Sequence, residues 1–185
     1  MKCGLLYTLA AGLFALPAQA ELTTGVAAPA FTTQASLAGK EFTYSLTEAL
    51  KTGPVVLFFY PKAFTSGCTV QAHDFAEAAG EFKAFGATII GISGDTIETL
   101  NRFSVSACQS KFPVGADRDR KIMKAYGAVM LMSYARRTSY VIAPDGKIIY
   151  SYTALLSPEK HVTNTTAAVK KWHEARKATV QPSPP

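Results

Sequence analysis

The sequence predicts an α/β fold in which helices cover both faces of a mixed central sheet. Two apolar strand patterns, residues 54–60 and 87–93, flank an amphipathic helix pattern over residues 66–85, which is the order of a β-α-β unit. Two later strand patterns are joined by a tight turn and followed by a last helix. A length of 185 residues favours one domain.

The first 20 residues have the composition of a secretory signal peptide. Lys2 supplies a positive charge, Gly4 to Leu16 is almost wholly apolar, and Ala18-Gln19-Ala20 has the small-x-small pattern of a cleavage site. This run of about 13 apolar residues is shorter than the ~20 that a membrane-spanning helix needs. We therefore expect residues 1–20 to be a signal peptide and residues 21–178 to be the folded domain, with an uncleaved membrane anchor as the alternative.

The signal peptide and the composition indicate where the protein works and which partners it can bind. An exported protein meets an oxidising environment, and we expect the periplasm as its destination. No second long apolar run follows, so we expect no membrane association after signal removal. The formal net charge of +6 becomes +5 without Lys2, and the basic residues are spread out, which favours solvated faces over nucleic-acid binding. We expect a monomer or a small homo-oligomer.

The first half of the domain contains the central strand and the helix that follows it. Residues 21–53 are polar and rich in small residues and breakers, so we expect short strands or loops there. The run from Pro54 to Tyr60 is continuously apolar and ends at Pro61, which predicts a strand buried on both faces.

The helix pattern over residues 66–85 has one apolar face. Its members recur at spacings of three and four residues, so they share one side of the helix. They are Cys68, Ala72, Phe75, Ala79 and Phe82. Cys68 is therefore expected to point inward at the start of this stripe.

The second strand leads into another helix. After residues 87–93, Asp95 and Glu98 form a capping-box-like start, and the helix is expected to run to about Cys108. Cys108 would share a face with Leu100, as core residues do.

The last third of the chain supplies the remaining elements of a thioredoxin-like fold. We expect a short strand over 112–116, a short helix over 120–126, strands over 138–142 and 147–152 joined by Ala-Pro-Asp-Gly, a helix over 158–177 and a disordered tail over 179–185.

Cys68 occupies a position suited to reactive chemistry. It lies in the first turn of a helix, just past the carboxyl end of a buried strand, and reactive groups of open α/β sheets gather at that edge. The helix N-terminus offers unpaired N–H groups and a partial positive charge, which favour a thiolate over a thiol.

A thiolate nucleophile also needs hydrogen-bond donors for the group that departs with negative charge. The Thr65 hydroxyl and the N–H groups of Gly67 and Cys68 are candidates, and Pro61, which lacks an N–H, could shield the sulfur from water.

A fixed cation would complete the pocket. Arg137 stands at the start of the strand predicted over 138–142, and its charge persists at any working pH. Its neighbour Arg136 is the competitor, but adjacent strand residues point to opposite faces, so only one of them enters the pocket.

The segment around Cys68 resembles a known active site. Pro61-x-x-x-Thr65-x-x-Cys68 matches the peroxiredoxin signature, and Phe-Tyr-Pro-Lys-Ala-Phe-Thr-x-Gly-Cys-Thr is similar to the bacterioferritin-comigratory, or peroxiredoxin Q, branch. The resemblance covers most of the domain and favours Arg137 over Arg136. It implies that Cys68 is the peroxidatic cysteine and that Thr65, Pro61 and Arg137 shape the peroxide pocket.

The activity implied is that of a thioredoxin-dependent type of peroxidase. It would reduce hydrogen peroxide or small alkyl hydroperoxides through a Cys68 sulfenic acid, with an external thioredoxin-like protein or small thiol as reductant. This chemistry requires no metal, haem or flavin, and no Cys/His cluster has zinc spacing.

The resolving cysteine, whose thiol would condense with the sulfenic acid, has two usual positions in this branch. Many members of this branch have it five residues after the peroxidatic cysteine, but this chain has His73 there, which we expect to be a surface residue. Other members have it in the next helix, where Cys108 is expected. We expect Cys108 to form an intramolecular disulfide with Cys68, with a structural Cys108 in a one-cysteine peroxidase, or a permanent bridge, as alternatives. A disulfide needs Cα atoms within ~7 Å, so a buried Cys108 requires local unfolding.

Two other functions stay open. An exported thiol–disulfide exchange protein could use the same fold, although Cys68 has no C-x-x-C partner. A non-catalytic exported binding module is the third hypothesis.

Overall fold

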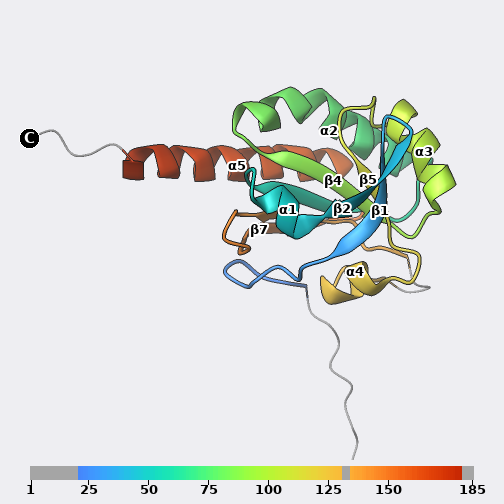
Figure 1. Ribbon diagram of the computed structural model, residues 1–185, viewed down its shortest axis with the longest axis horizontal. Coiled ribbons are helices and arrows are strands. Elements are labelled where there is room, and N and C mark those ends of the chain that lie inside the picture. The colour runs from blue at the N-terminus through green and yellow to red at the C-terminus, as the bar shows by residue number, and fades with distance from the viewer. Residues whose placement is uncertain (1–20, 131–133, 181–185) are drawn as a thin grey trace, which may run out of the picture.

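The computed structural model describes residues 21–130 and 134–180, so the predicted signal peptide lies outside the described residues. Seven strands of this part form one sheet in the order β2-β1-β5-β4-β3-β6-β7 (Figure 1). The strands are β1 (Thr32–Leu37), β2 (Lys40–Ser45), β3 (Val55–Phe59), β4 (Thr88–Ser93), β5 (Val114–Ala116), β6 (Thr138–Ile142) and β7 (Ile148–Thr153). The helices are α1 (Leu46–Leu50), α2 (Ser66–Ala84), α3 (Ile97–Ser106), α4 (Lys121–Ala125) and α5 (Pro158–Val180).

The sheet is mixed, which confirms the predicted class. β3 pairs in parallel with β4, and β4 in parallel with β5, whereas β3 with β6, β6 with β7 and both pairs of β1 are antiparallel. The register sets Phe59 of β3 opposite Thr138 of β6. Arg137 precedes Thr138, so this pairing brings Arg137 to the sheet edge where the chain leaves β3 for α2.

Helices cover both faces, as predicted. α2, α3 and α5 pack on one face, and α1 and α4 on the other. Every residue of β3 is buried, and its side chains alternate between the two cores, with Val56 and Phe58 in one and Leu57 and Phe59 in the other. The continuous apolar run of the sequence therefore corresponds to a strand in the middle of the sheet.

Aromatic stacking holds α2 against β3. The ring centroids of Phe58 and Phe75 are 4.4 Å apart and the rings are nearly parallel. Gly91 on β4 leaves room for Phe58, because a Cβ atom there would lie 2.6 Å from the Phe58 ring. This packing positions the helix that carries Cys68.

α1 differs from the prediction of strands or loops over residues 21–53. Strands β1 and β2 do form there, but Ser45 caps a short helix, accepting a hydrogen bond from the Glu48 backbone N–H. Ser-x-x-Glu is the capping-box spacing, so the sequence does contain the signal for this helix.

The start of α3 also differs from the prediction. Thr96, not Asp95, is the N-cap, and its hydroxyl accepts from the Thr99 backbone N–H. The Asp95 carboxylate instead accepts from the Ala63 N–H at 2.7 Å and the Ser93 hydroxyl at 2.8 Å. Asp95 therefore joins the loop after β3 to the loop after β4.

The ends of two helices correct the predicted bounds. α3 ends at Ser106, so Cys108 lies in the turn that follows it and not on the helix. α5 continues to Val180, so residues 179 and 180 do not belong to a disordered tail, and residues 181–185 lie outside the described residues. Between Pro158 and Pro182 the sequence has no proline or glycine, which allows the helix to continue.

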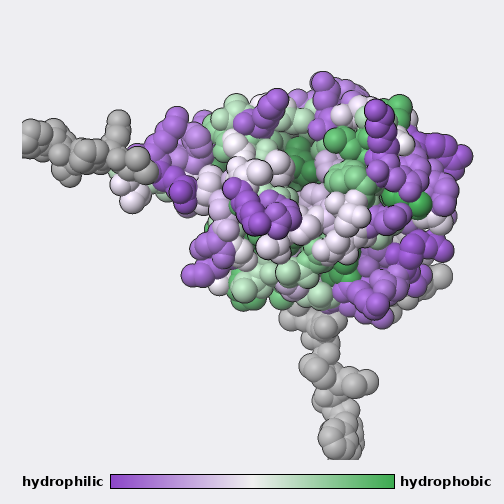
Figure 2. Space-filling model, in the orientation of Figure 1, coloured by the Kyte–Doolittle hydropathy of each residue, from purple (hydrophilic) through white to green (hydrophobic). Residues whose placement is uncertain are grey.

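The surface of the described residues combines hydrophilic and apolar areas. Hydrophilic residues are spread over the visible face, with smaller apolar areas between them (Figure 2). The C-terminal half of α5 extends beyond the sheet (Figure 1). Within the described ranges, no helix is both long enough and apolar enough to cross a membrane.

Candidate active site

Cys68 lies in the first turn of α2, with Thr65 as the N-cap of that helix. Its side chain is 1% exposed, and it forms no disulfide. Backbone N–H groups in the first turn of a helix have no intrahelical acceptor. A nearly buried sulfur at this position is therefore next to fixed partial positive charge.

Arg137 lies beside this sulfur. Its Nη2 is 3.5 Å from Cys68 Sγ, within hydrogen-bonding distance for sulfur. Arg137 is 4% exposed. Its Nε donates to the Leu155 carbonyl (3.0 Å), and its Nη1 donates to the Gly67 carbonyl (3.3 Å) and to the Gln71 side-chain oxygen. A cation held by three oxygens and directed at a sulfur favours the thiolate.

Gly67 has a contact that the sequence analysis did not predict. Its carbonyl accepts a hydrogen bond from Nη1 of Arg137, which leaves its N–H group as the predicted candidate donor to a departing oxygen. A Cβ atom at position 67 would lie 3.1 Å from Nη2 of Arg137. The absence of a side chain at Gly67 therefore lets the guanidinium approach the first turn of α2.

Gln71 is a site residue that the sequence analysis missed. It is fully buried on α2, three residues after Cys68 and so on the same face of the helix. Its oxygen accepts from Arg137, while its Nε2 has no hydrogen-bond partner among the described residues. A polar residue one turn along from Cys68, bordering an otherwise apolar stripe, was the available signal.

Thr65 and Pro61 lie on either side of the turn that begins α2. The Thr65 hydroxyl is exposed and donates to the Lys62 carbonyl at 3.0 Å, so its proton is used locally while its oxygen can still accept. Pro61 is half-buried and lines a cavity of about 260 Å³ with Asp95 and Tyr134, and Cys68 does not line that cavity.

Cys108 is fully buried in the same apolar core as Cys68. Burial raises the pKa of the Cys108 thiol, so this group stays protonated in its buried position. Its backbone N–H donates to the Phe103 carbonyl, and the Phe103 ring stacks on Tyr60 at 5.5 Å between centroids.

Tyr60 lies within electrostatic range of both cysteines. Burial raises its pKa well above the usual value, and Cys108 and Cys68 act in the same direction. Ser93 is close enough to lower that pKa but does not reach hydrogen-bond geometry, so the buried hydroxyl has no such partner among the described residues. Tyr60 and Phe103 thus form an aromatic layer next to both sulfurs.

The turn that carries Cys108 is tethered to α2. Gln109 and Ser110 adopt the left-handed conformation, with φ of 48° and 57°. Nε2 of Gln109 lies 2.8 Å from His73 Nδ1 and donates to Glu77 at 2.8 Å. His73, at the position where many relatives of this branch have a cysteine, is a surface residue, as predicted.

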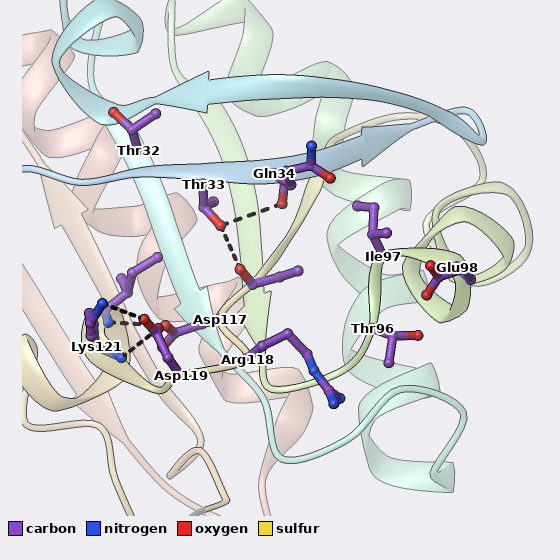
Figure 3. A pocket seen from close by; sticks show the side chains of 12 residues that line it. Thr32, Thr33, Gln34, Thr96, Ile97, Glu98, Asp117, Arg118, Asp119 and Lys121 are labelled. Atoms are coloured by element: carbon purple, nitrogen blue, oxygen red, sulfur yellow. Dashed lines mark hydrogen bonds and ion pairs between the residues drawn. The ribbon is translucent and has the colours of Figure 1, made fainter.

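A larger cleft lies elsewhere. It has a volume of about 740 Å³ and is lined by β1 and by the segments that begin α3 and α4 (Figure 3). Thr33 donates to the Ala116 carbonyl there, and Lys121 pairs with Asp119 at 2.7 Å. It contains none of the predicted site residues. Across the part of the chain that the structure describes, no group of three or more His, Cys, Asp or Glu side chains could hold a metal ion.

Comparison with known proteins agrees with this geometry. The chain is 34% identical over 147 residues to the chloroplastic peroxiredoxin Q of Oryza sativa subsp. japonica, covering 78% of this chain and 65% of that protein. It is 35% identical over 140 residues to the putative peroxiredoxin YkuU of Bacillus subtilis, covering 71% of this chain and 78% of the relative. The crystal structure of peroxidoxin BcpB from Mycobacterium tuberculosis superposes with a TM-score of 0.75 at 28% identity, covering 82% and 98% of the two chains.

The family assignment follows from these matches. The sequence model of the AhpC/TSA family matches residues 24–151, a range that includes Cys68, Cys108 and Arg137. The chain spans about two thirds of the rice relative and more than three quarters of the bacterial one. The protein therefore belongs to the AhpC/TSA family, and its relatives within that family include proteins named peroxiredoxin Q.

Proposed function

We propose that this protein is a thiol-dependent peroxidase whose Cys68 thiolate reduces hydrogen peroxide or a small alkyl hydroperoxide. One observation carries the proposal: Nη2 of Arg137 lies 3.5 Å from Cys68 Sγ at the N-terminus of α2. A buried cation and a helix N-terminus together stabilise negative charge on the sulfur and on an oxygen that leaves next to it.

The first step transfers one oxygen to sulfur. The Cys68 thiolate forms an S–O bond to one peroxide oxygen as the O–O bond breaks, and a sulfenic acid results. The other oxygen leaves as hydroxide or alkoxide and takes a proton to become water or an alcohol. Arg137 and the first N–H groups of α2 offset the charge of that oxygen, and the Thr65 hydroxyl oxygen accepts the peroxide O–H.

Cys108 is the proposed resolving cysteine. Its sulfur attacks the Cys68 sulfenic acid, which gives a disulfide and water, and an external dithiol then reduces the disulfide while becoming oxidised itself. Both cysteines are buried and form no disulfide in this structure, so in our proposal local opening of the turn after α3 brings the sulfurs together. The left-handed Gln109 and Ser110 support this step, because such residues carry backbone strain that opening relieves.

Peroxide consumption by the purified protein, with a dithiol as reductant, tests the first step. We expect turnover in the unaltered chain and none in Cys68→Ser. A Cys68→Ser protein with full activity would overturn the proposal. Cys108→Ser is the matched control, because it should still react with the first equivalent of peroxide.

Intact mass after one equivalent of peroxide tests the second step. Disulfide formation removes two hydrogens, and this loss should be absent in Cys108→Ser. A stable added oxygen in the unaltered protein would instead show a one-cysteine peroxidase with a structural Cys108.

We also propose that the enzyme works after export. The support is the sequence of residues 1–20, with Lys2, an apolar run and Ala18-x-Ala20. Fractionation of cells that express the full chain should give a periplasmic protein with Glu21 as its first residue. Recovery of the uncleaved chain in the cytosol would contradict this.

A further inference from the structure

His161 is a buried histidine close to the site. It lies in the first turn of α5 and has no exposed surface. Its Nδ1 is 2.9 Å from the Ser139 hydroxyl, and its Nε2 is 2.9 Å from the Ala154 carbonyl. A carbonyl can only accept, so Nε2 carries the proton and Nδ1 accepts from Ser139. The Tyr152 ring lies edge-on at 4.8 Å and fixes the plane of the imidazole.

The segment that His161 holds contacts Arg137 at two points. The Ala154 N–H donates to the Arg137 carbonyl at 3.3 Å, and the Leu155 carbonyl accepts from Nε of Arg137 at 3.0 Å. The side chains of Leu155 and Leu156 are 46% and 89% exposed. Apolar burial therefore contributes little to placing this segment, and its position depends on its hydrogen bonds.

We propose that His161 is a positioning residue for the peroxidase reaction: its Nε2–H fixes Ala154, so that the Leu155 carbonyl holds the Arg137 guanidinium against Cys68. This inference rests on the proposed peroxidase function. His161 does not contact the sulfur, and it acts only through the 154–155 segment. The Ala154 carbonyl sets the tautomer, because it can only accept and so keeps the proton on Nε2, and the Ser139 hydroxyl then donates to Nδ1.

The neutral imidazole suits this role. Burial, together with the positive charge of Arg137, lowers the pKa of His161 to about 4, although the hydrogen bond to the Ala154 carbonyl opposes this shift. An uncharged ring can lie close to Arg137 without repelling it, while its one N–H serves the Ala154 carbonyl.

Two variants of similar polarity separate positioning from general stability. In His161→Gln the longer amide reaches the place of Nε2 and keeps a donor for Ala154. In His161→Asn the shorter amide reaches the place of Nδ1 and serves Ser139 alone. Thr163→Ala, on the exposed side of α5, is the matched control.

Two reactions of Cys68 are measured in each variant: the second-order rate with hydrogen peroxide, and the rate of alkylation by iodoacetamide. We expect His161→Asn to lose about tenfold or more of the peroxide rate, because that reaction depends on the exact placement of the charged donor. Its limiting alkylation rate at high pH, where Cys68 is fully ionised in every variant, should stay within about twofold, since alkylation leaves no oxyanion for Arg137 to stabilise. His161→Gln and Thr163→Ala should keep the peroxide rate.

Several results would overturn the inference. Equal peroxide rates in the Asn and Gln variants would remove the role of the Nε2 donor. Equal losses in both reactions would show that His161 only stabilises the fold.

Hydrogen exchange of the Arg137 Nε–H group, followed by NMR, tests positioning without any peroxide. It should be slow in the unaltered protein and in His161→Gln, and fast in His161→Asn. If the unaltered protein consumes no peroxide, the proposed function fails, and the exchange rates still decide whether His161 positions Arg137.

Discussion

At the scale of single residues, the site depends on how closely Arg137 approaches the first turn of α2. Gly67 permits that approach and also supplies a carbonyl acceptor for the guanidinium. The guanidinium is held by three oxygens in a buried position, so it has little freedom to move aside.

Gly67→Ala should therefore lower the rate of Cys68 oxidation by about tenfold, because a small misplacement of a catalytic donor costs that much or more. Stopped-flow measurement of peroxide consumption checks this. Gly80→Ala is the matched control, since Gly80 lies exposed on the same helix with nothing within 4 Å of an added Cβ. It should keep the rate and stabilise the helix by up to ~1 kcal/mol. An unchanged rate in Gly67→Ala would show that Arg137 adapts.

Acid should destabilise the protein through His161. The pKa of His161 falls from 6.5 to about 4 on folding, so the unfolded chain binds a proton first as pH decreases. The free energy of unfolding should then be fully retained above pH 6.5 and fall by up to ~3 kcal/mol as the pH approaches 4. Besides Arg137, Glu159 faces the ring, and its charge opposes the shift.

Urea unfolding at a series of pH values measures this contribution as a difference between proteins. The unaltered protein should lose more stability between pH 6.5 and 4 than His161→Gln, which has no group titrating at this position. Parallel pH dependence in the two proteins would contradict the assignment.

At the scale of elements, the turn after α3 is the part that must move. It holds Cys108 in the core, has two consecutive left-handed residues, and is tied to α2 by the Gln109 side chain. These features describe a short segment whose closed state depends on a few hydrogen bonds at the surface.

Gln109→Ala should speed disulfide formation between Cys68 and Cys108. Loss of the contacts to His73 and Glu77 raises the population of the open turn, by about fivefold for ~1 kcal/mol of lost hydrogen bonding. Quenched samples analysed by mass after one equivalent of peroxide give the rate. Lys111→Ala, at an exposed position in the same segment, should change nothing. A slower reaction in Gln109→Ala would mean that the tether guides Cys108 toward Cys68.

The sequence was most informative where one periodic pattern dominated. The continuous apolar run of β3 and the 3–4 spacing of α2 each had one reading, and both elements formed as predicted. The predicted cap of α3 was Asp95, but its carboxylate accepts hydrogen bonds from Ala63 and Ser93, and Thr96 caps the helix instead. The contact with Ala63 joins residues far apart in the chain and leaves no local pattern in the sequence.

At the scale of the whole molecule, oxidation should weaken the fold. The described structure packs Cys108 with no exposed surface beside Tyr60 and Phe103, and in our proposal the disulfide with Cys68 forms when Cys108 leaves that position. The peroxide-oxidised protein should therefore unfold at lower urea concentration than the reduced one. Amide hydrogen exchange should increase over residues 103–112. Cys108→Ser should give the same midpoint with and without one equivalent of peroxide, and equal midpoints in the unaltered protein would contradict the opening.

The site was predictable only in part. The signature around Cys68 is local in sequence, so it could be read directly, and the resemblance selected Arg137 over Arg136. Gln71 and His161 were missed because their importance comes from contacts with Arg137 and with the segment after β7. Nothing in the spacing of these residues along the chain indicates that they meet.

The contact between Arg137 and Cys68 joins residues 69 positions apart, and Leu155, one of the three residues that hold the arginine, comes later still. During synthesis, Cys68 is therefore made long before Arg137 and Leu155. Until β6 has joined the sheet, the Cys68 sulfur lacks the arginine cation that lies beside it in the folded domain. Fast reaction with peroxide is therefore expected only of the complete domain, and a partly synthesised chain should react no faster than a free thiol.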